Sequence, residues 1–180
     1  AYLNEGDEVL IPNPSYPTYT SVTNLLGGKI VSYPLVEENN YHPDFDALEK
    51  RDLSKVKIMW INYPHMPTGA RASKELLEKV VAFGRKHKIL IVNDNPYSFI
   101  LNDSPMSIMS IEGAKDCCIE LNSLSKSHNM PGWRVGMICG KAEMLEPVLK
   151  VKTNMDSGMF YPVQQAAVKA LAQDQSWYDS

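Results

Sequence analysis

Lys126 lies in a short segment whose residue types could bind a phosphorylated aldehyde. Ser123 and Ser125 precede the lysine, and Arg134 follows it eight residues later. A lysine amine can form a Schiff base with an aldehyde cofactor, while hydroxyl groups and a guanidinium can hold the phosphate of that cofactor. A single lysine in a polar loop is usually a solvated surface residue. The spacing from the serines and the arginine favours the cofactor site over that interpretation.

Residues 123–136 read Ser-Leu-Ser-Lys-Ser-His-Asn-Met-Pro-Gly-Trp-Arg-Val-Gly. This segment resembles the cofactor-lysine signature of the class I/II aminotransferases, the fold-type I enzymes that use pyridoxal 5'-phosphate. The family pattern is Ser-x-Ser/Ala-Lys, then Gly-x-Arg-x-Gly, with the arginine eight residues after the lysine. The resemblance implies that Lys126 is the catalytic, Schiff-base lysine. It also implies that Ser123, Ser125 and Arg134 bind the phosphate.

A second motif, Asp94-Asn95-Pro96-Tyr97, follows an apolar run. The family has an Asp-x-x-Tyr motif at this place. The resemblance implies that Asp94 keeps the pyridine nitrogen of the cofactor protonated, so that the ring can accept electrons from the substrate's α-carbon. It also implies that Tyr97 hydrogen-bonds the phenolate oxygen of the cofactor. Taken alone, Asp-Asn-Pro indicates only a turn with a capping role.

Residues 12–19, Pro-Asn-Pro-Ser-Tyr-Pro-Thr-Tyr, resemble the family segment that places an aromatic ring on the face of the pyridine. The Pro-Ser-aromatic-Pro pattern identifies Tyr16 as that ring. Stacking of this kind contributes about 0.5–1.5 kcal/mol beyond the burial of area. The other interpretation of Tyr16 is a loop aromatic that covers the edge of the core.

A third motif departs from the family at one position. Residues 62–69 read Asn-Tyr-Pro-His-Met-Pro-Thr-Gly, whereas the family turn ends in Asn-Pro-Thr-Gly and its asparagine amide donates to the phenolate oxygen. Met66 stands in the asparagine's place and has no such donor. A missing donor to a charged oxygen is worth about 1.5–3 kcal/mol. We therefore expect the imine of the bound cofactor to stay protonated to higher pH than in relatives with asparagine. His65 and a water molecule are the two candidates to replace the amide.

Short apolar runs alternate with amphipathic segments, which is typical of an α/β fold. Most of the runs are continuous rather than alternating, as expected of a parallel sheet that is covered on both faces. We therefore predict a three-layer αβα sandwich with a mostly parallel sheet, the architecture of an aminotransferase large domain. The predicted strands are Glu8–Ile11, Lys29–Pro34, Val56–Asn62, Ile89–Asn93, Cys117–Asn122 and Val135–Cys139.

The clearest predicted helix runs from about Lys74 to His87, with Ser73 as its N-cap. A second helix is predicted from about Pro162 to Ala172, and Pro147 must begin, bend or split any helix within Lys141–Asn154. Ligands of doubly wound sheets bind beyond the carboxyl ends of the strands. The motifs at Lys126, Asp94 and the Pro-Thr-Gly turn all follow strands, so we expect them at one edge of the sheet.

Composition excludes several other functional classes. A net charge of −3 over 180 residues gives no support to binding of nucleic acid or an anionic membrane surface, and no apolar run is long enough to span a bilayer. The three cysteines, an odd number without CxxC spacing, indicate a reducing compartment, which we expect to be the cytoplasm. His42, His87 and His128 have no metal-ligand spacing, so we predict no metal site and interpret them as surface or loop residues.

The resemblance implies that residues 1–180 are part of the large domain that binds pyridoxal phosphate. It places three family elements outside this chain: the N-terminal arm, a further phosphate-binding turn, and the C-terminal small domain with the arginine for the substrate's α-carboxylate. We therefore expect residues 1–180 alone to bind cofactor weakly and to transaminate poorly or not at all. Family members are homodimers, and the resemblance implies the same for the full-length protein.

The function that we predict is exchange of an amino group between an amino acid and a 2-oxo acid, through a Schiff base on Lys126. Two alternatives share these residues. One is another fold-type I enzyme, namely a carbon–sulfur lyase, a decarboxylase or a synthase. The other is a non-catalytic, aminotransferase-like sensing domain of a transcription regulator, which would have a winged-helix segment upstream.

Overall fold

The computed structural model describes residues 1–179, and its centre is a six-stranded sheet in the order β2-β1-β3-β4-β5-β6. All neighbouring strands are parallel except β6, which runs antiparallel to β5. The mostly parallel sheet confirms the predicted fold class. The strands are β1 (Glu8–Asn13), β2 (Lys29–Pro34), β3 (Val56–Ile61), β4 (Leu90–Asp94), β5 (Cys118–Ser123) and β6 (Gly136–Cys139).

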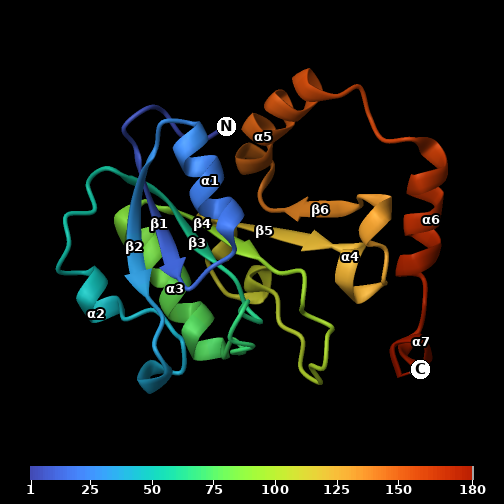
Figure 1. Ribbon diagram of the computed structural model, residues 1–180, viewed down its shortest axis with the longest axis horizontal. Helices are drawn as coiled ribbons and strands as arrows, with labels where there is room; N and C mark the ends of the chain where they lie inside the picture. The colour runs from blue at the N-terminus through green and yellow to red at the C-terminus, as the bar shows by residue number, and fades with distance from the viewer. Residues whose placement is uncertain (180) are drawn as a thin grey trace.

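Helices connect the strands and cover both faces of the sheet (Figure 1). The α-helices are α1 (Pro17–Leu25), α2 (Phe45–Leu48), α3 (Lys74–His87), α4 (Leu124–Ser127), α5 (Ala142–Met155), α6 (Tyr161–Leu171) and α7 (Gln175–Asp179). The 3-10 turns are η1 (Glu37–Asn39), η2 (Ile108–Ser110), η3 (Ala114–Asp116) and η4 (Pro131–Trp133). None of the helices within residues 1–179 combines the length and the apolar character that a membrane crossing requires.

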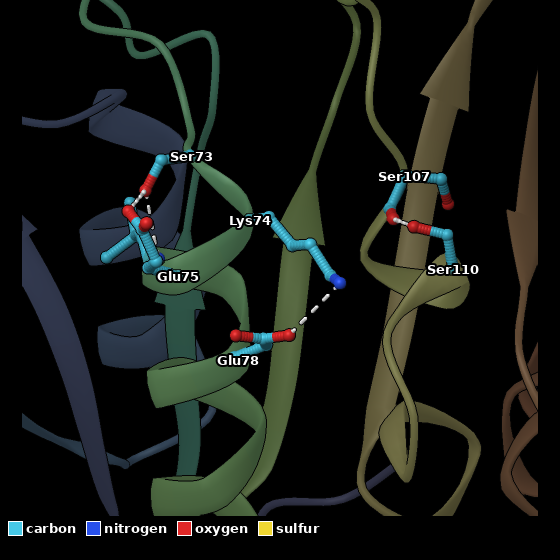
Figure 2. Close-up of polar contacts among 7 residues, drawn as sticks. Ser73, Lys74, Glu75, Glu78, Ser107 and Ser110 are labelled. Carbon is cyan, nitrogen blue, oxygen red and sulfur yellow. Dashed lines mark hydrogen bonds and ion pairs between the residues drawn. The ribbon is translucent and has the colours of Figure 1, made fainter.

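Helix α3 has the bounds that its sequence predicts. The Ser73 hydroxyl accepts a hydrogen bond from the Leu76 amide, which satisfies one of the free N–H groups of the first turn. Figure 2 shows this turn together with the Lys74–Glu78 ion pair, whose atoms are 3.6 Å apart on the exposed side. On the buried side, a Cβ at Gly84 would lie 2.7 Å from Ile91 Cγ1. Glycine therefore lets α3 pack directly on β4.

The core has two parts, one on each face of the sheet, because successive side chains of a strand point to opposite faces. Leu10 and Ile91 pack with α3 on one face, whereas Val9 and Ile11 pack with Tyr19 of α1 on the other. The first turns of α5 join this second face through partly buried side chains. The observed layers are therefore helix, sheet and helix.

Two of the differences from the predicted elements involve proline. Helix α1 is not among the predicted helices, and its Pro17 occupies the first turn, where a missing N–H costs nothing. Helix α5 runs through Pro147 without ending. That proline is the sixth residue of the helix, where its ring removes one backbone donor but the following turns still form.

Candidate functional site

A cavity of about 380 Å³ opens at the carboxyl ends of β4 and β5. All seven residues that the sequence motifs single out line this cavity, and each is described below. The structure thus brings together segments that are up to 118 positions apart in the chain, from Tyr16 to Arg134. Five further residues complete the lining: Tyr19, Asn62, Met66, Pro96 and Pro131.

The strand ends bring the carboxylate and the amine to this edge. Asp94 is the last residue of β4 and pairs with Leu121 of the neighbouring strand. Ser123 ends β5 and also caps α4, because its hydroxyl accepts a 3.1 Å hydrogen bond from the Ser125 amide. Lys126 is exposed on that single helical turn. The end of β5 therefore places both serines and the lysine in one cavity.

Asp94 is held by Tyr19, a residue to which the sequence motifs assign no role. The Tyr19 hydroxyl donates a 2.6 Å hydrogen bond to Asp94 Oδ2. The Tyr19 ring is buried and stacks on Trp60, with ring centroids 4.5 Å apart and an interplanar angle of 9°. Burial raises the pKa of Asp94, and the Tyr19 bond partly offsets this effect by favouring the charged form. Burial and the adjacent carboxylate raise the pKa of Tyr19 well above its ordinary value, so its hydroxyl is a donor.

Asn62 connects the turn after β3 to the end of β4. Its Nδ2 donates to the backbone oxygen of Asp94 at 2.6 Å, and its Oδ1 accepts from the Met66 amide at 2.8 Å. Because Asn62 is buried, these two bonds fix the turn relative to the carboxylate. The Met66 side chain lines the cavity and is 44% exposed. A thioether cannot donate a hydrogen bond, so the side chain at this position offers no donor to a ligand.

His65 is not the replacement for the missing amide. It is buried, it does not line the cavity, and both ring nitrogens have other partners. Nδ1 lies 2.8 Å from Thr68 Oγ1, and Nε2 lies 3.2 Å from the backbone oxygen of Pro14. The ring therefore links the Met66 turn to the segment that carries Tyr16.

The two predicted tyrosines, Tyr16 and Tyr97, both line the cavity but differ in how exposed they are. Tyr16 immediately precedes α1 and is 52% exposed, and its ring meets Tyr19 edge to face at 5.9 Å. An exposed ring at a cavity wall is available for stacking on a flat ligand. Tyr97 is half-buried beyond β4, and burial together with Asp94 raises the pKa of its hydroxyl.

Arg134 is positioned by the antiparallel pairing of β5 with β6. Ser123 pairs with Gly136, and a Cβ at that glycine would lie 2.8 Å from the backbone oxygen of Asn122. Only glycine therefore permits this close approach. Arg134 has a positive φ of 54°, and its guanidinium donates a 2.8 Å hydrogen bond to the Pro131 oxygen. That single bond leaves other donors of the guanidinium for a ligand.

The donor set of the cavity fits pyridoxal phosphate. Lys126 supplies an amine for the aldehyde, and Arg134 with two serine hydroxyls supplies donors for a phosphate. The Tyr19 bond is made to Asp94 Oδ2, which leaves Oδ1 of the carboxylate as an acceptor for a protonated ring nitrogen. Within the same residues there is no group of three or more His, Cys, Asp or Glu side chains that could hold a metal ion.

Tyr19 and Asn62 lie within the quoted motifs, but the sequence analysis assigned neither of them a role. Tyr19 is three residues after Tyr16, and Asn62 directly follows β3, a strand whose neighbour ends in Asp94. Polar residues at adjacent strand ends were the signal that could have identified Asn62. His128 lies in the turn after α4, as the loop interpretation expects, but it is not at the surface: the ring is buried and stacks on Trp177, and Nε2 lies 2.9 Å from the Tyr178 hydroxyl.

The sequence is similar to those of known aminotransferases. A family model described as "Aminotransferase class I and II" matches residues 1–179. The chain is 46% identical over 174 residues to the LL-diaminopimelate aminotransferase of Nitratidesulfovibrio vulgaris, covering 95% of this chain and 45% of that protein. It is 47% identical over 172 residues to the enzyme of the same name from Halothermothrix orenii, covering 94% and 44%.

Solved structures agree with these relatives. The apo structure of BacF from Bacillus subtilis superposes with a TM-score of 0.95 at 38% identity, covering 99% of this chain and 46% of that one. The aromatic aminotransferase from Pyrococcus horikoshii superposes with a TM-score of 0.89 at 34% identity, covering 98% and 48%. The chain thus spans a little under half the length of the proteins that it matches.

Proposed function

Because this chain belongs to the class I and II aminotransferases, we propose that its cavity is the pyridoxal-phosphate site of an aminotransferase. The observation that carries the proposal is the convergence of all seven motif residues on one cavity at the carboxyl edge of the sheet. The proposed reaction is exchange of an amino group between an amino acid and a 2-oxo acid.

Each residue has a proposed role toward the cofactor. Lys126 holds the aldehyde carbon, while Arg134, Ser123 and Ser125 hold the phosphate. Asp94 pairs with the ring nitrogen, and the hydrogen bond from the Tyr19 hydroxyl orients its carboxylate. Figure 1 shows that β4 and β5, which end in Asp94 and Ser123, lie side by side, so one ligand can contact both ends.

Two tyrosines complete the proposed binding site. Tyr16 covers one face of the ring, as its exposed position at the cavity wall allows. The hydroxyl of Tyr97 donates to the phenolate oxygen. Since Met66 offers no donor, Tyr97 is then the protein side chain on which that oxygen depends.

Bound pyridoxal phosphate supplies an electron sink for the bond that breaks at the substrate's α-carbon. The chain's own contribution to that step is proton transfer. With the cofactor and an amino acid bound, the amine of Lys126 would move a proton at the substrate's α-carbon. Its amine must be neutral to accept that proton. The exposed position of Lys126 on a single helical turn gives the side chain room for this movement.

The relatives suggest which substrate to test first. Several are named LL-diaminopimelate aminotransferases at 43–47% identity. We therefore propose LL-diaminopimelate as the first amino donor to assay, with 2-oxo acids as acceptors. We further propose a cytoplasmic homodimer, and an arginine for the α-carboxylate outside residues 1–180.

The experiment that tests the proposal uses the full-length protein. Added pyridoxal phosphate should give the absorbance of a lysine-bound cofactor, and transfer of the amino group should depend on an added 2-oxo acid. Lys126→Ala should abolish both signals. The control is Lys115→Ala, which removes an exposed lysine in η3, before β5 rather than after it. Retained absorbance and turnover in Lys126→Ala would refute the assignment, and turnover without an oxo acid would indicate a lyase or decarboxylase.

A further inference from the structure

Glu120 is a buried carboxylate on β5 that the proposed chemistry does not use. Its side chain is 2% exposed, and no ion pair to it occurs within residues 1–179. Burial of an uncompensated carboxylate is unfavourable, so the protein must supply hydrogen-bond donors in place of water. Four neutral donors do this.

The four donors converge on the two carboxylate oxygens. Oε1 accepts from the Ser107 hydroxyl at 2.9 Å and from Asn122 Nδ2 at 3.2 Å. Oε2 accepts from Asn93 Nδ2 at 3.0 Å and from the Ile108 amide at 2.9 Å. A carboxylate suits these four donors because its two oxygens act only as acceptors.

Two of the donors fix the carboxylate relative to the sheet. Asn93 is the register partner of Glu120 on β4 and directly precedes Asp94. Asn122 is two residues further along β5 and directly precedes Ser123. Glu120 therefore has a rigid position beneath the cavity edge, on the α3 face of the sheet where Cys118 also packs.

The other two donors, Ser107 and Ile108, lie where the loop that contains Tyr97 meets η2. This loop, residues 95–107, has no helix or strand, and its middle exposes Phe99, Ile100 and Leu101. The bond from Asn95 Nδ2 to the Met106 oxygen, at 3.2 Å, joins the two ends of the loop. The middle is contacted by Arg71, which donates to the Leu101 oxygen, and by Tyr178, which stacks on Phe99. A loop without regular structure keeps one conformation only if its ends are held.

Glu120 holds the C-terminal end of this loop. Its bonds to the Ser107 hydroxyl and the Ile108 amide fix the start of η2. Figure 2 shows this turn, where the Ser110 hydroxyl bonds back to the Ser107 oxygen at 2.7 Å. The loop is thus attached to the sheet at both sides, through β4 at Asp94 and through Glu120 at η2.

We propose that Glu120 is a positioning residue that orients Tyr97 by fixing the end of its loop. This inference rests on the proposed function, in which the Tyr97 hydroxyl donates to the cofactor's phenolate oxygen. Glu120 does not line the cavity, so in this proposal it acts through the loop and not by direct contact with a ligand. With Met66 unable to donate, the orientation of Tyr97 matters more than it would beside a second donor.

The test is Glu120→Gln in the full-length protein. Glutamine keeps the shape but directs an NH₂ group at donors, so at least one end of the network loses its acceptor. We expect affinity for pyridoxal phosphate to fall about tenfold or more. Hydrogen exchange of the amides in residues 95–110 should become faster, while exchange in β1 and β3 stays unchanged. The matched control is Glu112→Gln, an exposed carboxylate in the same part of the chain, which should change neither measurement.

A double-mutant cycle separates positioning from general stabilisation. If Glu120 acts through the Tyr97 hydroxyl, Glu120→Gln should cost little further affinity once Tyr97→Phe has removed that hydroxyl. Unchanged affinity in Glu120→Gln, or losses that add fully in the double variant, would overturn the inference. If Glu120→Gln does not fold, Ser107→Ala removes one donor only, and the same cycle with Tyr97→Phe decides.

Failure of the proposed function would look different. Wild-type protein that does not bind pyridoxal phosphate refutes the cofactor assignment. Hydrogen exchange then still decides whether Glu120 holds the loop: faster exchange confined to residues 95–110 in Glu120→Gln supports that part, and unchanged exchange overturns it.

Discussion

The hydroxyl of Tyr19 donates a 2.6 Å hydrogen bond to the carboxylate of Asp94, 75 residues further along the chain. Tyr19 is buried in α1 and stacks on Trp60, so its position is fixed by the core rather than by the cavity. The bond favours the charged form of Asp94, against the effect of burial. Tyr19 thus favours the charged form of Asp94, the residue that we assign to the cofactor's ring nitrogen.

Replacing Tyr19 by phenylalanine should therefore raise the pKa of Asp94 further. The ring and its stacking on Trp60 stay, while one hydrogen bond to a charged group is lost, worth about 1.5–3 kcal/mol. Because the lost bond favours the charged form, the free energy of unfolding should fall more at pH 7 than at about pH 3, which lies below the ordinary pKa of an aspartate and further below the raised pKa of Asp94. Urea denaturation at both pH values measures the difference.

The control for this variant is Tyr161→Phe, which removes the hydroxyl of an exposed tyrosine. It should be neutral at both pH values. If Tyr19→Phe loses the same stability at pH 3 and at pH 7, the contribution of this bond does not depend on the charge of Asp94, and the prediction is wrong.

Met66→Asn should lower the pH at which the bound cofactor loses its proton, by about one to two units. The new amide supplies a donor to the phenolate oxygen, and the backbone bond from residue 66 to Asn62 does not depend on the side chain. Absorbance as a function of pH measures the midpoint. Met66→Leu is the matched control, since leucine also lacks a donor. Identical midpoints in all three proteins would exclude residue 66 as the cause.

His65 should make the stability of the protein depend on pH. Burial lowers the pKa of its imidazole, and the bond to the Pro14 oxygen opposes this only in part. The folded state therefore binds fewer protons than the unfolded state below about pH 6.5. The free energy of unfolding should fall as the pH falls through that value, and the loss is complete only below the folded pKa.

His65→Gln isolates this contribution. It removes the titrating ring while the lowered pKa of His128 stays and contributes equally to both proteins. Chemical denaturation between about pH 7 and 5 should give a shallower decline for the variant than for the wild type. Parallel curves would contradict the prediction.

The two glycines around Arg134 should differ in their tolerance of alanine. A Cβ at Gly136 would meet the Asn122 oxygen at 2.8 Å, whereas a Cβ at Gly132 would have nothing within 4 Å. Gly136→Ala should cost about 1–3 kcal/mol of stability, because the β5–β6 pairing must shift. It should also weaken binding of pyridoxal phosphate by displacing Arg134. Gly132→Ala should be close to neutral in thermal denaturation, and equal effects would refute the argument from close packing.

The strands and their mostly parallel pairing could largely be predicted, because continuous apolar runs at regular spacing mark buried parallel strands, whereas their order in the sheet came only from the structure. Helix α1 could not, since the same prolines suit a loop or a first helical turn. Likewise, no pattern distinguishes a buried His128 from an exposed one. Its ring is covered by Trp177 and Tyr178, some 50 residues further along the chain, and contacts of that kind depend on how α6 and α7 fold back.

The sequence alone determined the types and the spacing of the residues that line the cavity, and it determined their common edge, because loops that follow parallel strands meet at the carboxyl ends. Only the tertiary structure decided which groups support them. Tyr19 behind Asp94, Asn62 between two segments, and four donors around Glu120 are hydrogen bonds between distant parts of the chain. Such bonds depend on angles and distances of a few tenths of an ångström, which local residue patterns do not specify.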